Sequence, residues 1–478
     1  MARGCAFITI RGRRPPAETR RDCYAYTCRR SATLIWSCIL LCGPARQPCV
    51  PQSRTPAPGA GHVVLQSVDI RSDEDGGEFR LSLRARSRGA SWEIKGKEAG
   101  ALSLSVDGLY DQHIFLVRGP EESIYEALLG PLPKGNHHLR IDWDRSWAPA
   151  LDVSPEILQV QAAALDRSHP RNERVVRAPI IYLRADTIGR FSDVPLFLYC
   201  EEEQRVRATE VVYTVILSNE DGGTSTRNLL ARWGRTTDIE WCYAYDREEN
   251  AFVDRFQGRD HETFPFQGKY LGMHPILYDV ARNNIFADTP AGDAPVRVRL
   301  VPVHALLEGK ARETVMDRFP WIYPIMAKEM IREQKLETVG DPYTPRPSDH
   351  RNYAYVDFCS EQAGTALWAE VQLRGSKRWY RSDHGDPESR IGRSGCVRTS
   401  VELPPGTVPS DLKALRIGCA GAPLSEGETP AGNPAAHLDS VLQVFLLDSD
   451  YRPSPSLPGR NIRRILRPGQ YRTLRLGE

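Results

Sequence analysis

Residues 236–245 read TTDIEWCYAY, and this run predicts a β-strand near the middle of the chain. Successive side chains of a strand point to opposite faces, so Asp238 and Glu240 should share one face. That face presents two carboxylates about 7 Å apart, two strand residues along. The opposite face would be apolar and belong in a hydrophobic core, with Ile239, Trp241, Tyr243 and Tyr245 on it.

Similar apolar runs flank this strand and indicate a β-rich block over residues 178–305. Polar loops separate these runs, and long loops on a rigid sheet are a usual location of binding residues. One run ends at Asn219–Gly223, where glycines can adopt the positive φ of a tight turn.

The regions outside this block show strand and turn patterns as well, apart from one helical stretch broken by Pro320 and Pro324. We therefore expect a mostly β fold of two to three tandem β-sandwich domains, with a short helical segment between the second and third. The expected segments are a signal peptide (1–45), a Pro/Gly-rich linker (46–61), an immunoglobulin-like sandwich (62–149), a connector with one short helix near 155–165 (150–177), the central sandwich (178–305), a helical segment and linker (306–349) and a C-terminal β-rich domain (350–478).

The composition is that of a soluble globular protein, with 41% hydrophobic and 26% charged residues among 478. Such a length exceeds one ordinary core. Residues 1–50 carry nine Arg against one Asp and one Glu, a charge of +7, so the remainder carries −5 of the total +2. An acidic body argues against a nucleic-acid partner, because phosphate binding needs clustered cations.

The N-terminus predicts export. Arg29 and Arg30 precede an apolar stretch over Ser31–Cys42, which has the length of a signal-peptide core, and Ala45 suits a cleavage site. No run of 18 apolar residues exists, so no transmembrane span is expected in the mature chain. We expect a secreted or periplasmic protein.

Five cysteines follow the leader and linker. In an oxidising compartment Cys200–Cys242 and Cys396–Cys419 are plausible disulfides, which would leave Cys359 over. The alternative is that these cysteines are buried free thiols.

The carboxylates of residues 238–240 suggest two kinds of chemistry. Asp238, Glu240 and Asp288 could bind Ca²⁺ or Mg²⁺, because hard cations prefer oxygen ligands. Asp238 and Glu240 could instead act as acid and base, with His274 as a third catalytic residue. An ordinary solvated strand face is the plain alternative.

Further polar residues are candidates for ligand binding. Asp260, His261 and Glu262 lie in one predicted loop, and Asn284 follows a later strand. Trp379 stands beside an acidic, His-containing loop, a composition that suits a sugar subsite as well as a surface turn.

Residues 177–288 resemble Vps62-type domains and, more distantly, necrosis-inducing proteins of the NPP1 type. The resemblance rests on the order Asp238–Trp241, then His274–Pro275 through Tyr278, then Asn283–Asn284. Ile239, Trp241 and Asn284 differ from the residues found in those families. The resemblance implies a β-sandwich with a divalent-metal site that serves binding to glycolipid head groups.

Three functions follow as hypotheses. The first is an exported protein that binds an extracellular glycan or glycolipid, directly or through a divalent cation. The second is a hydrolase or lyase acting on a polysaccharide. The third is a structural protein of the cell envelope.

Overall fold

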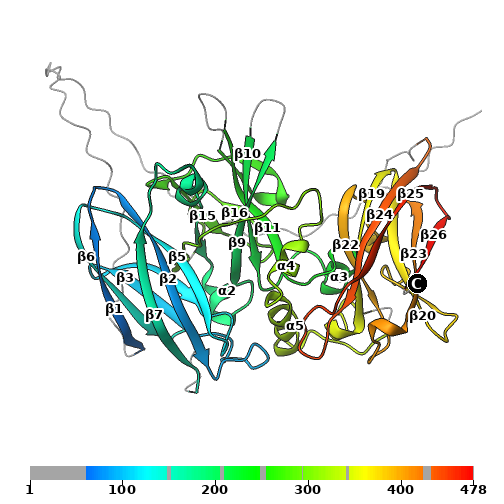
Figure 1. Ribbon diagram of the computed structural model, residues 1–478, viewed down its shortest axis with the longest axis horizontal. Coiled ribbons are helices and arrows are strands. Elements are labelled where there is room, and N and C mark those ends of the chain that lie inside the picture. Colours follow the sequence, from blue (N-terminus) through cyan, green and yellow to red (C-terminus); the bar gives the residue numbers. More distant parts are fainter. Residues whose placement is uncertain are drawn as a thin grey trace, which may run out of the picture. The chain divides into compact units, whose positions relative to one another are not determined.

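The computed structural model describes residues 61–147, 152–204, 209–247, 254–292, 294–340, 344–423 and 432–476. The expected signal peptide and all but Gly61 of the expected linker lie outside these residues. Strands dominate the described chain and form six separate sheets, which confirms the mostly β fold with several sandwich-like layers (Figure 1).

The first seven strands, blue to cyan in Figure 1, form a sheet of four and a sheet of three. Alternating burial along β2, with Leu81, Leu83 and Ala85 fully buried, shows that this strand presents one face to the core. The four-stranded sheet runs β1 (His62–Ser72), β6 (Gly135–Asp144), β3 (Ala101–Val106), β4 (Leu109–Phe115), and the three-stranded sheet runs β5 (Ser123–Leu132), β2 (Gly77–Arg88), β7 (Ser154–Ala164).

The prediction of a short helix near residues 155–165 is wrong. These residues form β7, which pairs antiparallel with β2 over ten register positions, from Ser154 opposite Arg88 to Ala164 opposite Phe79. The alanines of this run favour a helix, but the unpaired edge of β2 satisfies the backbone hydrogen bonds of the segment as a strand. Tertiary pairing therefore outweighs local propensity here.

The central block contains a six-stranded and a five-stranded sheet. The first has the order β13 (Thr263–Pro265), β12 (Asp254–Gln257), β11 (Asp238–Arg247), β10 (Thr209–Leu217), β9 (Pro195–Gln204), β18 (Val303–His304). The second has the order β14 (Tyr270–Leu271), β15 (His274–Asp279), β8 (Ile180–Leu183), β17 (Val296–Val298), with β16 (Phe286–Ala287) also on β15.

A β-bulge changes the alternation of side chains along β11. Glu240 lies opposite Val215 of β10, and Tyr243 lies opposite Tyr213, so Cys242 is the extra residue. Because Tyr213 and Val215 share a face of β10, their partners share a face of β11. The expectation that Tyr243 and Tyr245 lie on the face of Ile239 and Trp241 is therefore wrong. A one-residue bulge moves every later side chain to the opposite face.

Short helices connect and cover the strands. The expected break of the helical segment is confirmed, since α4 ends before Pro320 and α5 has Pro324 in its first turn. Ile325, Met326 and Met330 of α5 are buried. The helices are α1 (Glu173–Val176), α2 (Ala185–Arg190), α3 (Thr226–Trp233), α4 (Thr314–Arg318) and α5 (Ile322–Arg332), with 3₁₀ turns at Pro170–Asn172, Arg259–His261, His350–Asn352, Pro387–Ser389 and Pro409–Asp411.

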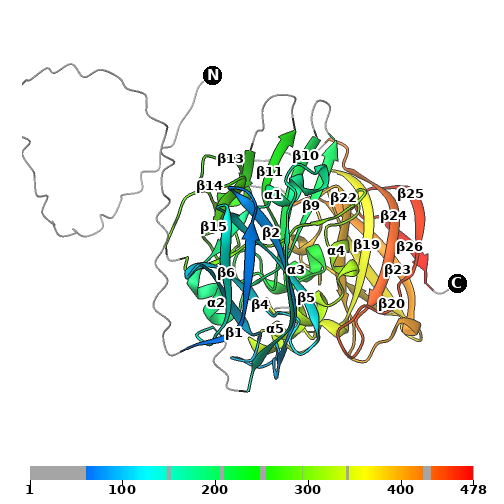
Figure 2. The same cartoon turned by 60° about the vertical axis from the view of Figure 1, so that its left-hand side comes forward.

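The last eight strands, yellow to red in Figure 2, form two four-stranded sheets around a core of their own. Arg398 is fully buried and bonds to Asp357 of the neighbouring β19. It joins this part to α4 through Asp317 and to α5 through Tyr323. The sheets are β22 (Gly395–Glu402), β19 (Tyr353–Ala363), β24 (Ala435–Leu446), β25 (Leu457–Leu466), and β21 (Trp379–Arg381), β20 (Thr365–Leu373), β23 (Leu412–Gly421), β26 (Tyr471–Arg475).

The expected cysteine pairs are wrong. Cys359 bonds to Cys396, its direct neighbour across β19 and β22, whereas Cys419 is a buried free thiol in the other sheet. Cys200 and Cys242 are buried free thiols on β9 and β11, with β10 between them. The two cysteines are therefore separated by two strand spacings, about 10 Å, and this distance is too long for a disulfide.

Candidate functional site

A cleft of about 670 Å³ opens beside the first half of β11, and we call it the central cleft. β12 pairs with β11 at Tyr243–Tyr245. On the same edge of β11, the residues Asp238–Trp241 are therefore not covered by β12. Trp241 of β11 and Trp233 at the end of α3 line the cleft with their large rings. The combination of aromatic walls with a few convergent polar groups is typical of small-molecule sites.

Four side chains from four different segments form a connected polar chain in this cleft. Asn283 donates to Glu220 Oε1 at 3.1 Å and accepts from His261 Nε2 at 2.7 Å. His261 Nδ1 lies 3.7 Å from Glu240 Oε2 and 2.5 Å from Gln257 Nε2. Two carboxylates are therefore linked through one amide and one imidazole.

Glycines allow the loops that carry this chain to meet. A Cβ atom on Gly222 would lie 2.9 Å from the carbonyl carbon of Arg282. Gly223 has φ +76°, which confirms the expected tight turn, and a Cβ there would lie 2.2 Å from the amide group of Asn283. Only residues without a side chain allow this approach of backbone to backbone.

Asp238 lies behind the cleft and is only 1% exposed. Its Oδ2 accepts from Asn284 Nδ2 at 3.0 Å, and its Oδ1 lies 3.5 Å from Arg235 Nη1. Arg235 in turn donates to Glu313 Oε1 at 3.2 Å. These buried contacts support the end of β11, and Arg235 and Glu313 also line the central cleft.

The carboxylates of this region have different proton affinities. Burial raises the pKa of Glu220 to about 7, against the charge of Arg235. Burial also raises the pKa of Asp238 well above its usual range, with the charges of Glu240 and Glu220 adding to the effect. Burial alone would raise the pKa of Glu240, but hydrogen bonding with His261 and the charge of Arg235 outweigh it and lower the pKa. At neutral pH one acid near the cleft can hold a proton while another is ionised.

The structure brings only some of the expected residues together. Glu240 and His261 meet in the central cleft, while Asp238 and Asn284 meet behind it. Asp260 and Glu262 flank His261 on the surface, and Asp260 pairs with the neighbouring Arg259 at 3.4 Å.

The other expected residues lie in separate surroundings. His274 is buried, with Nδ1 2.8 Å from the Ala178 carbonyl oxygen and Nε2 3.6 Å from Glu78. Asp288 accepts from the Gln267 backbone N–H at 2.8 Å. Trp379 lies on β21 of the last part of the chain.

Asp238 and Asp288, two of the residues expected to bind Ca²⁺ or Mg²⁺, are each held by protein partners. Among the described residues, no three His, Cys, Asp or Glu side chains form a metal-binding group. Asp238 is engaged by Asn284 and Arg235, and Asp288 by Gln267.

Glu220, Arg235 and Glu313 are the important residues that the strand pattern did not identify. Glu220 precedes Asp221–Gly222–Gly223 and reads as part of a turn, while Glu313 lies almost a hundred residues away. The one available signal was the glycine pair after Glu220, which marks a close approach of two backbone segments.

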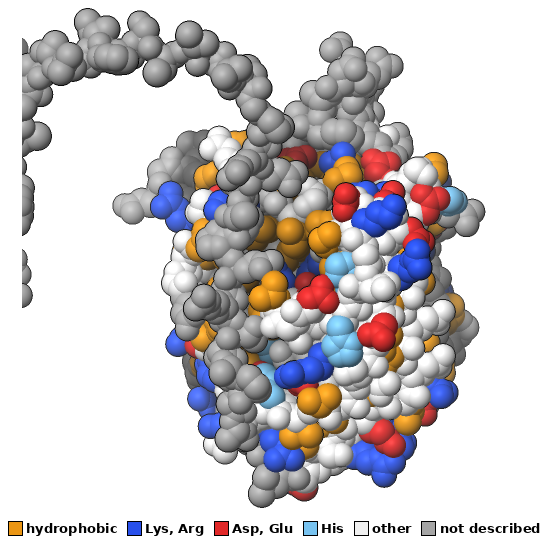
Figure 3. Space-filling model, turned by 90° about the vertical axis from the view of Figure 1, so that its left-hand side faces the viewer, with side chains coloured by type: hydrophobic (Ala, Val, Ile, Leu, Met, Phe, Trp, Pro, Cys, Tyr) orange, Lys and Arg blue, Asp and Glu red, His pale blue; other side chains and the backbone are white. Residues whose placement is uncertain are grey.

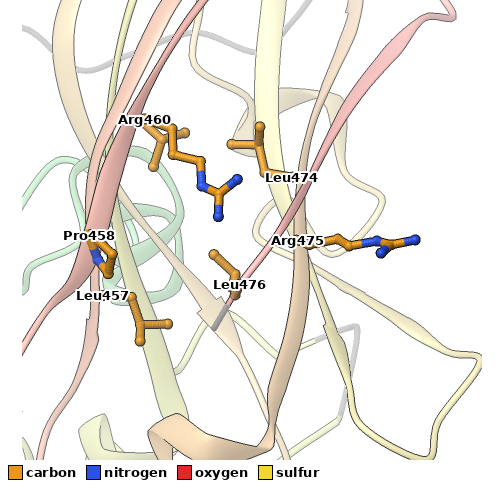
Figure 4. A pocket seen from close by; sticks show the side chains of 7 residues that line it. Leu457, Pro458, Arg460, Leu474, Arg475 and Leu476 are labelled. Atoms are coloured by element: carbon orange, nitrogen blue, oxygen red, sulfur yellow. The ribbon is translucent and has the colours of Figure 1, made fainter. Parts of the chain in front are cut away.

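Other polar clusters and hollows have simpler explanations. Figure 3 shows histidines that lie among acidic and basic side chains on one side of the molecule. In the first part of the chain, His113 pairs with Asp144 and His138 pairs with Asp69. The hollow in Figure 4 between β25 and β26 has a volume of only about 10 Å³. It is large enough for little more than one water molecule.

No family model matches the chain, and no curated protein matches it. Among solved structures, one similar chain is a family two carbohydrate esterase from Clostridium thermocellum in complex with cellohexaose. The alignment has 18% identity and a TM-score of 0.14, and it covers 25% of this chain and 30% of that chain. A TM-score this low carries no argument. No helix among the described residues is long and apolar enough to cross a membrane.

Proposed function

We propose that this protein is exported and binds an extracellular glycan in the central cleft. The observation that carries the proposal is the cleft of about 670 Å³ in which two tryptophans lie beside the chain Glu220–Asn283–His261–Glu240. Aromatic rings bury large apolar area against the C–H faces of a sugar, and carboxylate, amide and imidazole groups can bond its hydroxyls.

The cleft is built to hold such polar groups in place before a ligand arrives. Arg393 stacks on Trp233, with its guanidinium carbon 5.1 Å from the ring centroid, and donates to the Arg232 carbonyl oxygen at 2.6 Å. Glu220 also accepts from the Thr224 backbone N–H at 3.2 Å. Side chains that are already fixed lose less conformational entropy on binding.

Titration calorimetry with a panel of soluble polysaccharides tests this proposal. Trp241→Ala should weaken binding about tenfold, because it removes roughly 1.4 kcal/mol of ring contact. Ile465→Ala removes an exposed side chain of β25 and serves as the control. Absence of saturable binding, or equal affinity in both variants, would contradict the proposal. Arms with added Ca²⁺ and with a chelator show whether binding needs a cation.

Cleavage of a glycosidic bond in the same cleft is the second candidate function. It is favoured by the pKa difference between Glu220 and Glu240, since one acid must donate a proton while the other acts as a carboxylate. Glu220 would protonate the leaving oxygen, and Glu240 would activate water or attack the anomeric carbon.

Release of reducing sugar separates this candidate from binding alone. Glu220→Gln and Glu240→Gln should each reduce the rate at least about 100-fold, and the rate should fall above pH 7 as Glu220 loses its proton. Saturable binding without any sugar release would exclude hydrolysis and keep the binding proposal.

A further inference from the structure

A second cleft, of about 450 Å³, lies at β21 and is lined by Trp379 and Tyr380. We call it the Trp379 cleft. Among the described strands, β21 pairs only with β20, through Trp379–Arg381, and so lies at the edge of its sheet. Side chains at such an edge are open to a partner, because no further strand covers them.

The two aromatic rings are held in place by arginines. Arg416 lies 4.2 Å from the centroid of Trp379, and Arg378 lies 4.8 Å from that of Tyr380. Arg416 is not part of the cleft lining, so it supports Trp379 from outside the cleft. A half-exposed tryptophan supported on its outer side leaves ring surface for a flat ligand.

The lining of this cleft has more cationic side chains than carboxylates. Asp383 neutralises Arg381 through two bonds of 2.8 Å. Within the described part of the chain, Arg227 and Arg378 form no ion pair, and Glu402 is the one acid of the lining.

Of the two unpaired cations, Arg227 gives the stronger evidence for an anionic ligand. It is 6% exposed, and its guanidinium donates to the Thr344 carbonyl oxygen at 2.9 Å. Among the described residues this carbonyl oxygen is the one partner of the Arg227 guanidinium, and a buried cation without an anionic partner keeps its charge at a free-energy cost. An anionic ligand in the adjoining cleft would remove that cost. Arginine also matches planar anions with two parallel N–H groups.

We propose that the Trp379 cleft binds an acidic glycan, with anionic substituents on Arg227 and Arg378 and a sugar face on Trp379. The shared chemistry is an anionic group on a sugar ring, either a uronate carboxylate or a sulfate ester. The inference does not rest on the central cleft, which is lined by other residues.

Binding to three polymers tests this inference: polygalacturonate, dextran sulfate and neutral dextran. The full chain should bind at least one of the two anionic polymers and not dextran, with affinity falling as salt rises. Binding to polygalacturonate alone identifies a carboxylate receptor, and binding to dextran sulfate alone identifies a sulfate receptor. Equal binding of dextran, or binding of none of the three, would overturn the proposal.

Matched variants separate a built site from general charge attraction. Arg378→Ala and Trp379→Ala should each weaken binding at least fivefold, whereas Lys377→Ala, which removes an exposed neighbouring cation, should leave it within twofold. An equal loss in Lys377→Ala and Arg378→Ala would overturn the proposal. Ile465→Ala, which removes an exposed side chain of β25 that lines neither cleft, should leave this binding unchanged.

Discussion

Asp238 and Glu240 are two residues apart on one strand but lie in different surroundings. Asp238 is buried against Asn284 and Arg235, whereas Glu240 reaches the central cleft beside His261. Alternation along a strand predicts that the two acids share a face, but it does not predict which of them other segments cover. Their roles therefore differ, with Asp238 supporting the fold and Glu240 available to a ligand.

Asp238→Ala should lower the free energy of unfolding by about 2 kcal/mol, because it removes the buried carboxylate that accepts from the Asn284 amide and one of the two acids beside the buried Arg235. Glu240→Gln should change it by less than about 1 kcal/mol, since its side chain is partly exposed and keeps its shape. Urea unfolding of both variants measures the difference. Equal losses would mean that both acids are structural.

At the scale of elements, a covalent link joins two neighbouring strands of one sheet in the last part of the chain. Cys359 of β19 bonds to Cys396 of β22, and Cys396 also lines the central cleft. The bond closes a loop with a sequence separation of 37 residues, which restricts the unfolded chain. The same strand, β22, carries Thr399 and Ser400, whose hydroxyls donate to carbonyl oxygens of α3.

Replacing both bonded cysteines by serine should lower the free energy of unfolding by about 2–4 kcal/mol. Alkylation of the unfolded, unreduced protein should label Cys200, Cys242 and Cys419 but neither Cys359 nor Cys396. Labelling of Cys359 together with an unchanged melting temperature in the double variant would show that the bond does not form.

At the scale of the molecule, several acids are buried with raised proton affinity. Burial raises the pKa of Glu329 on α5 to about 8, against the charge of Arg332, and that of Asp279 to about 6, against Arg184. Glu220 has a pKa of about 7 for the same reason. The folded chain therefore binds more protons than the unfolded chain between the ordinary and the raised pKa values.

Stability should consequently fall as the pH rises through this window, because stability decreases with pH wherever the folded state holds the extra protons. We expect a lower melting temperature at pH 8.5 than at pH 6.5. Burial lowers the pKa of His350 and of His384 to about 4, so these two side chains titrate below this pH range. Glu329→Gln should reduce the decline. A melting temperature that rises over the same range would contradict the assignment.

The sequence by itself determined the strand content, the tight turn at Gly223 and the break of the helical segment at Pro320. These features depend on local preferences, which are alternation of side chains, positive φ at glycine and the missing N–H of proline. Local sequence patterns also predicted Glu240 on a strand and His261 in a loop, where a site could form.

Only the tertiary structure decided which of these residues meet. The bulge at Cys242 reversed the faces of Tyr243 and Tyr245, and the free edge of β2 made residues 154–164 a strand. Disulfide partners and the chain from Glu220 to Glu240 depend on segments far apart in sequence. Pairing between strands and the packing of distant loops have no local signal, because their free energy arises only when the whole core assembles.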